Sequence, residues 1–198
     1  MQKINTKWMV KVAMLSAISV VLMLVEFPLP FIAPPFYKID FSEVPVLIGT
    51  FALGPLAGVV IEFIKVVLNL LINGTITGGV GEAANFVVGV CLILPAGLIY
   101  KYRKNKKQAI IGMITGTVIM VIAGVFVNAY LLIPAYGKAL GMPLQAFVDM
   151  GKAIHSSIDS LLEMVIYCVA PFNALKCVVV SIITAFIYKP LSKVFKAN

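Results

Sequence analysis

The stretch from Val44 to Ile72, VPVLIGTFALGPLAGVVIEFIKVVLNLLI, decides the fold of this chain. Its length suits either one long, tilted membrane-spanning helix or two consecutive helices, since one span needs about 20 residues. Gly54-Pro55 supplies a break, because proline removes a backbone donor and disfavours helix in the residue before it. Ser42 as an N-cap and Pro45 in the first turn are typical of a helix start.

The composition places this stretch in a membrane. The chain has 198 residues, of which 61% are hydrophobic and 12% are charged, and its mean hydropathy is +1.05. An ordinary soluble domain has about 45–50% apolar and about 25% charged residues. A soluble fold of this size cannot bury so much apolar surface. We therefore predict one membrane domain over residues 1–198, which excludes a soluble enzyme and a disordered tail.

The distribution of basic residues decides between one helix and two in the opening stretch. Of the 16 basic residues, 11 fall in three clusters: Lys3, Lys7 and Lys11; Lys101, Arg103, Lys104, Lys106 and Lys107; and Lys189, Lys193 and Lys196. Basic loops face the cytoplasm in membrane proteins, so the chain must cross an even number of times between successive clusters. This parity requires two helices in the opening stretch and places both termini in the cytoplasm. It also explains the net charge of +8 without a nucleic-acid partner.

We therefore predict an all-α polytopic membrane protein with six helices. The second helix is too short to span the bilayer and must be tucked among its neighbours. The expected helices cover residues 8–28, 44–53, 55–72, 83–100, 109–134 and 161–188. The loops at residues 29–41, 73–82 and 135–160 then face the outside. The first of these is rich in proline and aromatic residues, so it is either a stiff cover for a ligand or a simple connection.

Polar groups within the apolar segments are few, and such groups mark functional sites by default. Glu62 and Lys65 stand three residues apart on one helix and can form a structural ion pair. Asn128, Asn173 and Lys176 lie on the last two helices. Their amides can hydrogen-bond a ligand with donor and acceptor edges, or they can link neighbouring helices. Lys176 has no acidic residue within a helical turn, so it needs a distant partner or a ligand.

Several functions are disfavoured by missing motifs. The chain lacks the phosphate-binding GxxxxGK[ST] loop and any nucleophile–base arrangement, so we expect neither ATP hydrolysis nor other catalysis. The three cysteines have no metal-ligand spacing, and we expect no metal and no cofactor. Deep charges are too few for an obvious ion relay, and the two halves are not repeats, as they are in many secondary carriers.

Five motifs together resemble the riboflavin-specific substrate-binding (S) component of energy-coupling factor (ECF) transporters. They are YKIDFSEVP at 37–45, FALGPLAG at 51–58, TGGVGE at 77–82, NAY at 128–130 and APFNALK at 170–176. The resemblance extends over nearly the whole chain. It implies a multi-pass protein of the bacterial cell membrane that captures riboflavin at the outer face and has no ATPase activity. It also implies two kinds of partner, a transmembrane coupling (T) component and two cytoplasmic ATPases.

The resemblance implies specific residue roles. The expected ligand-binding residues are Asn128, Asn173 and Lys176, with Lys38, Asp40, Phe41, Tyr130, Gly79 and Asn85 around them. Ala13 and Ala17 match the small-residue pattern by which the first helix of an S component contacts the T component. Two alternatives stay open at this stage: an S component for another vitamin, or a stand-alone secondary carrier.

Overall fold

The computed structural model describes residues 5–196, with side chains up to Tyr188. The helices are α1 (Thr6–Leu24), α2 (Glu43–Leu53), α3 (Pro55–Asn73), α4 (Val80–Tyr102), α5 (Lys106–Val127), α6 (Ile133–Leu140), α7 (Leu144–Lys152), α8 (Leu161–Met164) and α9 (Ala170–Lys196). Two π-helical turns, η1 (Asn128–Leu132) and η2 (Val165–Val169), join α5 to α6 and α8 to α9. Strands β1 (Phe27–Pro28) and β2 (Lys38–Ile39) form one antiparallel pair.

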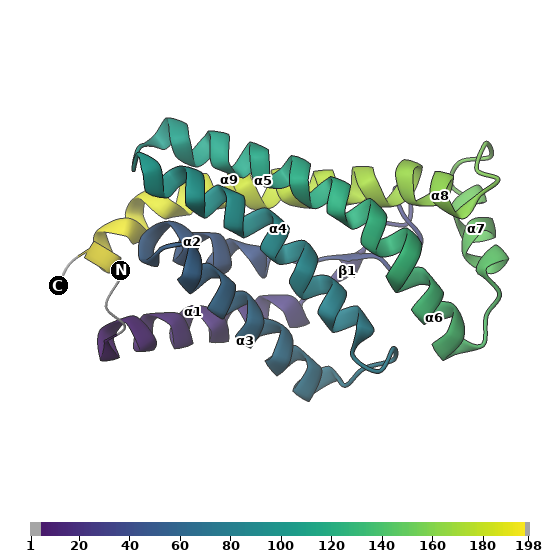
Figure 1. Ribbon diagram of the computed structural model, residues 1–198, viewed down its shortest axis with the longest axis horizontal. Helices are drawn as coiled ribbons and strands as arrows, with labels where there is room; N and C mark the ends of the chain where they lie inside the picture. The colour runs from purple at the N-terminus through teal and green to yellow at the C-terminus, as the bar shows by residue number, and fades with distance from the viewer. Residues whose placement is uncertain (1–4, 197–198) are drawn as a thin grey trace.

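The helices form an elongated bundle (Figure 1). Five helical segments are long and apolar enough to cross a membrane: α1, α3, α4, the continuous helix over 106–140 and the continuous helix over 161–188. The sixth, α2, has only 11 residues. The prediction of an all-α membrane protein with a short second helix is confirmed.

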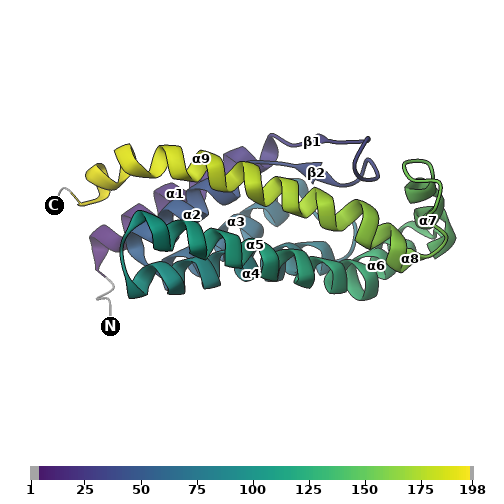
Figure 2. The ribbon, with the colours of Figure 1, turned by 90° about the horizontal axis from the view of Figure 1, so that it is seen from above.

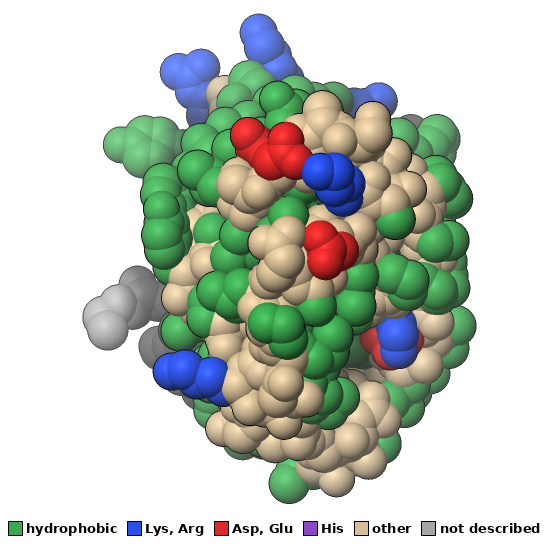
Figure 3. Space-filling view, turned by 90° about the vertical axis from the view of Figure 1, so that its right-hand side faces the viewer, with side chains coloured by type: hydrophobic (Ala, Val, Ile, Leu, Met, Phe, Trp, Pro, Cys, Tyr) green, Lys and Arg blue, Asp and Glu red, His purple; other side chains and the backbone are tan. Residues whose placement is uncertain are grey.

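One end of the bundle carries the three basic clusters. The start of α1, the turn between α4 and α5 and the end of α9 all lie at the left of Figures 1 and 2. This arrangement agrees with the even number of crossings that the sequence predicts, and we refer to this end as cytoplasmic. Lys3 lies outside the described residues, as do the side chains of Lys189, Lys193 and Lys196. Figure 3 views the opposite, outer end, where mostly hydrophobic and uncharged groups surround a few charged side chains.

Helix α2 lies inside the bundle. Every residue of α2 except Ala52 is buried. The break that the sequence predicts falls at Gly54, whose φ of 100° favours glycine, and Pro55 opens α3. Ser42 precedes α2, as predicted, but its side chain makes no capping hydrogen bond, so the prediction that Ser42 caps the helix is wrong. Ser42 has helical φ and ψ, whereas a capping residue is usually extended.

Helix α1 ends earlier than the sequence predicts, at Leu24 rather than at Pro28. Phe27 and Pro28 instead pair with Ile39 and Lys38. A proline fixes φ and has no N–H, which suits the end of a helix and an edge strand better than a helix interior. The resulting hairpin carries the chain from the outer end back into the bundle.

The two π-helical turns share one cause. In each, the residue just before a proline donates its N–H to the carbonyl five residues back: Ile133 to Asn128, before Pro134, and Ala170 to Val165, before Pro171. Proline has no N–H and its ring clashes with the carbonyl four residues earlier, so the helix accommodates it by widening one turn. These turns lie beside the residues that the sequence marks as polar, and π-helical turns are frequent at functional sites.

The bundle has two buried apolar clusters. The inner one centres on α2 and is lined by α1, α3, α4 and α9. The outer one joins the hairpin loop to α7, α8 and η2, with Phe147, Ile158 and Met164 fully buried. The segment 135–160, expected as a loop, therefore contains the end of α6 and all of α7. The two clusters leave a cavity between them and the outer end of α4.

Candidate ligand-binding pocket

A cavity of about 430 Å³ opens between the hairpin, α4, η1, α6 and α9. This volume is typical of a site for a small organic molecule. Its aromatic and apolar walls include Phe36, Tyr37, Tyr136, Phe172 and Met120. Polar and charged groups stand at separate points of the wall: Glu26, Lys38, Asp40, Glu43, Asn69, Glu82, Asn85, Asn128, Asn173 and Lys176. The structure therefore brings six of the nine expected ligand-binding residues together.

The distant partner that Lys176 requires is Asp40. The Lys176 ammonium donates to Asp40 Oδ2 at 2.7 Å, and the two side chains are only 12% and 6% exposed. Asp40 Oδ1 accepts the Ser42 N–H at 2.8 Å, which fixes the carboxylate against the start of α2. Burial by itself would raise the pKa of Asp40, but the ammonium groups of Lys176 and Lys65 hold that pKa at about 2. Asp40 is therefore ionised, and Lys176 keeps further N–H donors for a ligand.

Asn128 is held in one orientation from two sides. Its Nδ2 donates to the Gly124 carbonyl at 2.7 Å, and its Oδ1 accepts the Tyr37 hydroxyl at 2.7 Å. Burial raises the pKa of the Tyr37 phenol above its usual value, so this hydroxyl stays protonated and donates. The hydroxyl of Tyr37 thus fixes the orientation of the Asn128 amide, although the two residues are 91 positions apart.

Asn173 faces the cavity one helical turn before Lys176. Among the residues that the structure describes, its side-chain amide has no hydrogen-bond partner, and the residue is 8% exposed at the cavity wall, so the amide is accessible from the cavity. It packs against Gly124, where an added Cβ would lie 2.7 Å from Asn173 Nδ2. A ligand that fills the cavity can therefore hydrogen-bond to this amide.

A second group of charges lies behind the cavity. Lys65 contacts Glu43 at 2.6 Å and Glu62 at 2.7 Å, and all three side chains are at most 3% exposed. The pairing of Glu62 with Lys65 is as the sequence predicts. Glu43 was not expected there, because it precedes the apolar stretch and lies 22 residues from Lys65. Together with Asp40 and Lys176, these residues make three buried carboxyl groups and two buried ammonium groups.

The outer mouth of the cavity carries weaker, exposed interactions. Lys38 pairs with Glu26 at 2.5 Å across the hairpin, with 43% and 38% of the side chains exposed. Glu82, at the start of α4, accepts the Thr75 hydroxyl at 2.9 Å. Asn85 follows one turn later on the cavity wall. Such exposed pairs contribute little stability, so the mouth can rearrange while the deeper groups stay fixed.

Three expected ligand-binding residues do not line the cavity. Tyr130 is 71% exposed and stacks on Phe126. Phe41 packs on the inner apolar cluster and against Phe27. Gly79 has a φ of 94° in the turn before α4, a backbone conformation that favours glycine. Neighbouring residues of the same motifs line the cavity instead. A motif identifies a segment of the chain, and the direction of each side chain depends on the fold.

Three further aromatic residues line the cavity but were not predicted from the sequence as site residues: Phe36, Tyr37 and Phe172. Tyr37 and Phe36 belong to the proline-rich aromatic loop, and Phe172 precedes Asn173. Their rings contact one another, with centroids 4.5 Å apart for Phe36 and Tyr37 and 5.9 Å apart for Tyr37 and Phe172. The aromatic content of the loop was the signal that could have identified Phe36 and Tyr37, and the position of Phe172 beside Asn173 was the signal for the third.

The expected docking residues Ala13 and Ala17 are exposed on α1, opposite the buried face that includes Leu15 and Val20. They stand one turn apart, so their methyl groups leave a shallow surface that another helix can approach closely.

Comparisons with known proteins agree with this architecture. Residues 7–188 match the family model described as "ECF transporter, substrate-specific component". The riboflavin transporter RibU of Staphylococcus aureus is 34% identical over 97% of this chain and 94% of its own length. The riboflavin transporter FmnP of Bacillus subtilis is 37% identical over 93% of this chain and 91% of its own length.

A solved structure has the same fold. It is described as "Structure and mechanism of the S component of a bacterial ECF transporter". The two chains superpose with a TM-score of 0.74 at 34% sequence identity, over 96% of this chain and 98% of the other. The chain is therefore a multi-pass membrane protein and belongs to the family of substrate-specific components of ECF transporters.

Proposed function

We propose that this protein captures riboflavin at the outer face of the bacterial membrane for uptake by an ECF transporter. The observation that carries the proposal is the accessible amide of Asn173 beside the paired Lys176 on one wall of a 430 Å³ cavity. The similarity to riboflavin transporters over more than nine-tenths of the chain supports riboflavin as the ligand.

The chemistry of riboflavin matches the cavity. Its isoalloxazine ring is flat and uncharged, with carbonyl acceptors and one N–H donor along one edge, and its side chain is a polyhydroxy chain. Phe36, Tyr37 and Phe172 offer aromatic surface for the ring. Asn128, Asn173 and Lys176 offer amide and ammonium groups to its polar edge. Because Asp40 already neutralises Lys176, the ligand need not bring a negative charge.

The family supports a proposal for the partner subunits. We infer that this subunit binds the substrate, and that a T component and two cytoplasmic ATPases supply the energy for uptake. The exposed Ala13 and Ala17 on α1 are the proposed contact with the T component. Leucine at both positions should abolish uptake in cells and leave riboflavin binding to the isolated protein unchanged.

Purified protein is expected to bind one riboflavin per chain with submicromolar affinity. Titration with quenching of flavin fluorescence measures both the stoichiometry and the Kd. Thiamine and biotin, which lack the isoalloxazine ring, serve as matched competitors and should not displace the flavin. Absence of riboflavin binding, together with tight binding of another vitamin, would refute the proposed ligand but not the family.

Changing Tyr37 to phenylalanine is expected to weaken riboflavin binding about fivefold. The substitution keeps the ring contacts and removes the hydroxyl that orients Asn128, and one neutral hydrogen bond contributes about 1 kcal/mol. The same titration measures it. Tyr130→Phe is the matched control, because Tyr130 faces outward, and it should leave the Kd unchanged. Equal effects of the two substitutions would contradict the role given to Tyr37.

A further inference from the structure

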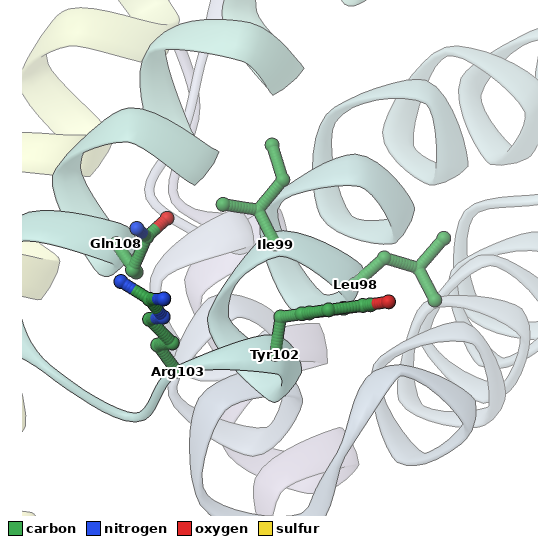
Figure 4. Close-up of a pocket in the computed structure, with 5 residues that line it drawn as sticks. All are labelled: Leu98, Ile99, Tyr102, Arg103 and Gln108. Carbon is green, nitrogen blue, oxygen red and sulfur yellow. The ribbon is translucent and has the colours of Figure 1, made fainter.

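A second hollow lies at the cytoplasmic end of the bundle, far from the ligand cavity. It measures about 490 Å³ and is lined by Leu98, Ile99, Tyr102, Arg103 and Gln108 (Figure 4). The first four residues come from the last turns of α4 and its C-cap, and Gln108 comes from the first turn of α5. The Asn105 side chain accepts the Gln108 N–H at 2.9 Å, so the turn between the helices holds Gln108 in place.

The hollow has a polar side and an apolar side. Arg103 and Gln108 lie side by side at one edge of the hollow, and the Arg103 guanidinium extends toward the Gln108 side chain (Figure 4). Leu98 and Ile99 lie one turn deeper along α4, and Tyr102 stands beside Arg103 with 94% of its surface exposed. A hydrocarbon wall that meets a tyrosine and a cation is the arrangement of groups at a membrane–water interface.

The charge around the hollow is of one sign. Residues 101–107 include five basic residues and no acidic residue. Among the residues that the structure describes, none of these five forms an ion pair with an acidic side chain. The cytoplasmic leaflet carries negative lipids, and juxtamembrane basic residues attract them. A planar guanidinium binds a phosphate group with two parallel hydrogen bonds, and the phosphodiester of a lipid is the anion available at this depth.

We propose that this hollow binds one anionic glycerophospholipid of the cytoplasmic leaflet. In this proposal Arg103 holds the phosphate, Gln108 lies beside it at the same edge, and Leu98, Ile99 and Tyr102 contact the glycerol and the start of the acyl chains. The lipid fixes the α4–α5 turn at the membrane surface. Another surface groove, between α5 and α9, is lined almost entirely by apolar side chains such as Ile114 and Ile182, so it carries no group that selects a headgroup.

Native mass spectrometry of the detergent-solubilised protein tests the proposal. Titration with phosphatidylglycerol is expected to give one saturable bound lipid, and phosphatidylcholine should bind at least about tenfold more weakly, because its choline cancels the charge. Arg103→Gln should weaken phosphatidylglycerol binding at least about tenfold, since it removes both the charge and the paired donors. Arg103→Lys, which keeps only the charge, should lie between Arg103→Gln and the wild type.

Lys107→Gln is the matched control, because Lys107 belongs to the same turn but does not line the hollow. The loss of one nearby charge should weaken binding by no more than about fivefold. Equal losses for Arg103→Gln and Lys107→Gln would overturn the proposal in favour of diffuse attraction by the whole loop. Full competition by soluble glycerol phosphate would also overturn it, since the apolar wall would then contribute nothing. Unchanged riboflavin binding shows that each variant is folded.

Discussion

Replacing Lys176 with methionine is expected to weaken riboflavin binding about 100-fold. The substitution removes a donor to the ligand and leaves Asp40 as a buried carboxylate without its partner. The lost hydrogen bond from a charged donor costs up to about 3 kcal/mol of affinity, which corresponds to about two orders of magnitude. The broken ion pair costs about 3–5 kcal/mol of stability. Fluorescence titration gives the Kd, and thermal unfolding in detergent gives the accompanying loss of stability.

Two further variants separate the binding role of Lys176 from its structural role. Lys176→Met combined with Asp40→Asn should regain most of the stability but none of the binding, because the uncompensated charge is gone while the ligand donor is still missing. Lys152→Met is the matched control. Lys152 also pairs with an aspartate at 2.6 Å, but that pair is largely exposed and should contribute almost nothing. If Lys176→Met binds within tenfold of the wild type, Lys176 does not contact the ligand.

Replacing Lys65 with methionine should produce the largest loss of stability. Glu43 and Glu62 would then face one another in the bundle interior without the ammonium group that separates them. We expect a loss of about 3–5 kcal/mol, because two buried carboxyl groups would lose the ammonium group that pairs with both of them. Thermal unfolding measures it. Lys138→Met, at an exposed position of α6, is the control and should have no effect.

If Lys65→Met does not fold, Glu62→Gln tests whether the balance of charge stabilises this cluster. Among Asp40, Glu43, Glu62, Lys65 and Lys176, carboxyl groups outnumber ammonium groups by one. Glu62→Gln should therefore cost no more than about 1 kcal/mol, since Lys65 still pairs with Glu43 and the excess carboxyl group is removed. Damage from Glu62→Gln as severe as that from Lys65→Met would show that individual contacts, rather than the balance of charge, stabilise this cluster.

The sequence predicted the course of the chain through the membrane better than it predicted the pocket. Helix breaks and basic loops are local signals, so Gly54-Pro55 and the loop at 101–107 were enough to separate α2 from α3 and to orient the chain. The buried Glu62–Lys65 pair was also local, because both residues lie on one face of one helix.

The pocket contacts could not be predicted because they join distant residues. Asp40 and Lys176 are 136 positions apart, and Tyr37 and Asn128 are 91 apart. The π-helical turns add a further difficulty. One extra residue in a turn rotates the helix beyond it by roughly 100°. The periodicity of a regular helix therefore predicts the wrong direction for side chains beyond Pro134 and Pro171. Asn128 and Tyr130 are two residues apart and face different sides of the helix, but the motif alone did not show which of these sides lines the pocket.

Because α2 is buried, the thickness of the bilayer does not constrain it as it constrains the neighbouring helices. A helix that faces lipid must match the thickness of the bilayer, and mismatch makes it tilt or deform the membrane. Helix α2 meets protein on nearly every side, so bilayer thickness sets neither its length nor its tilt. Its size is set by the packing of α1, α3, α4 and α9 around it. A change of lipid composition therefore acts on the five spanning segments, while α2 keeps the close-packed interior of a water-soluble protein.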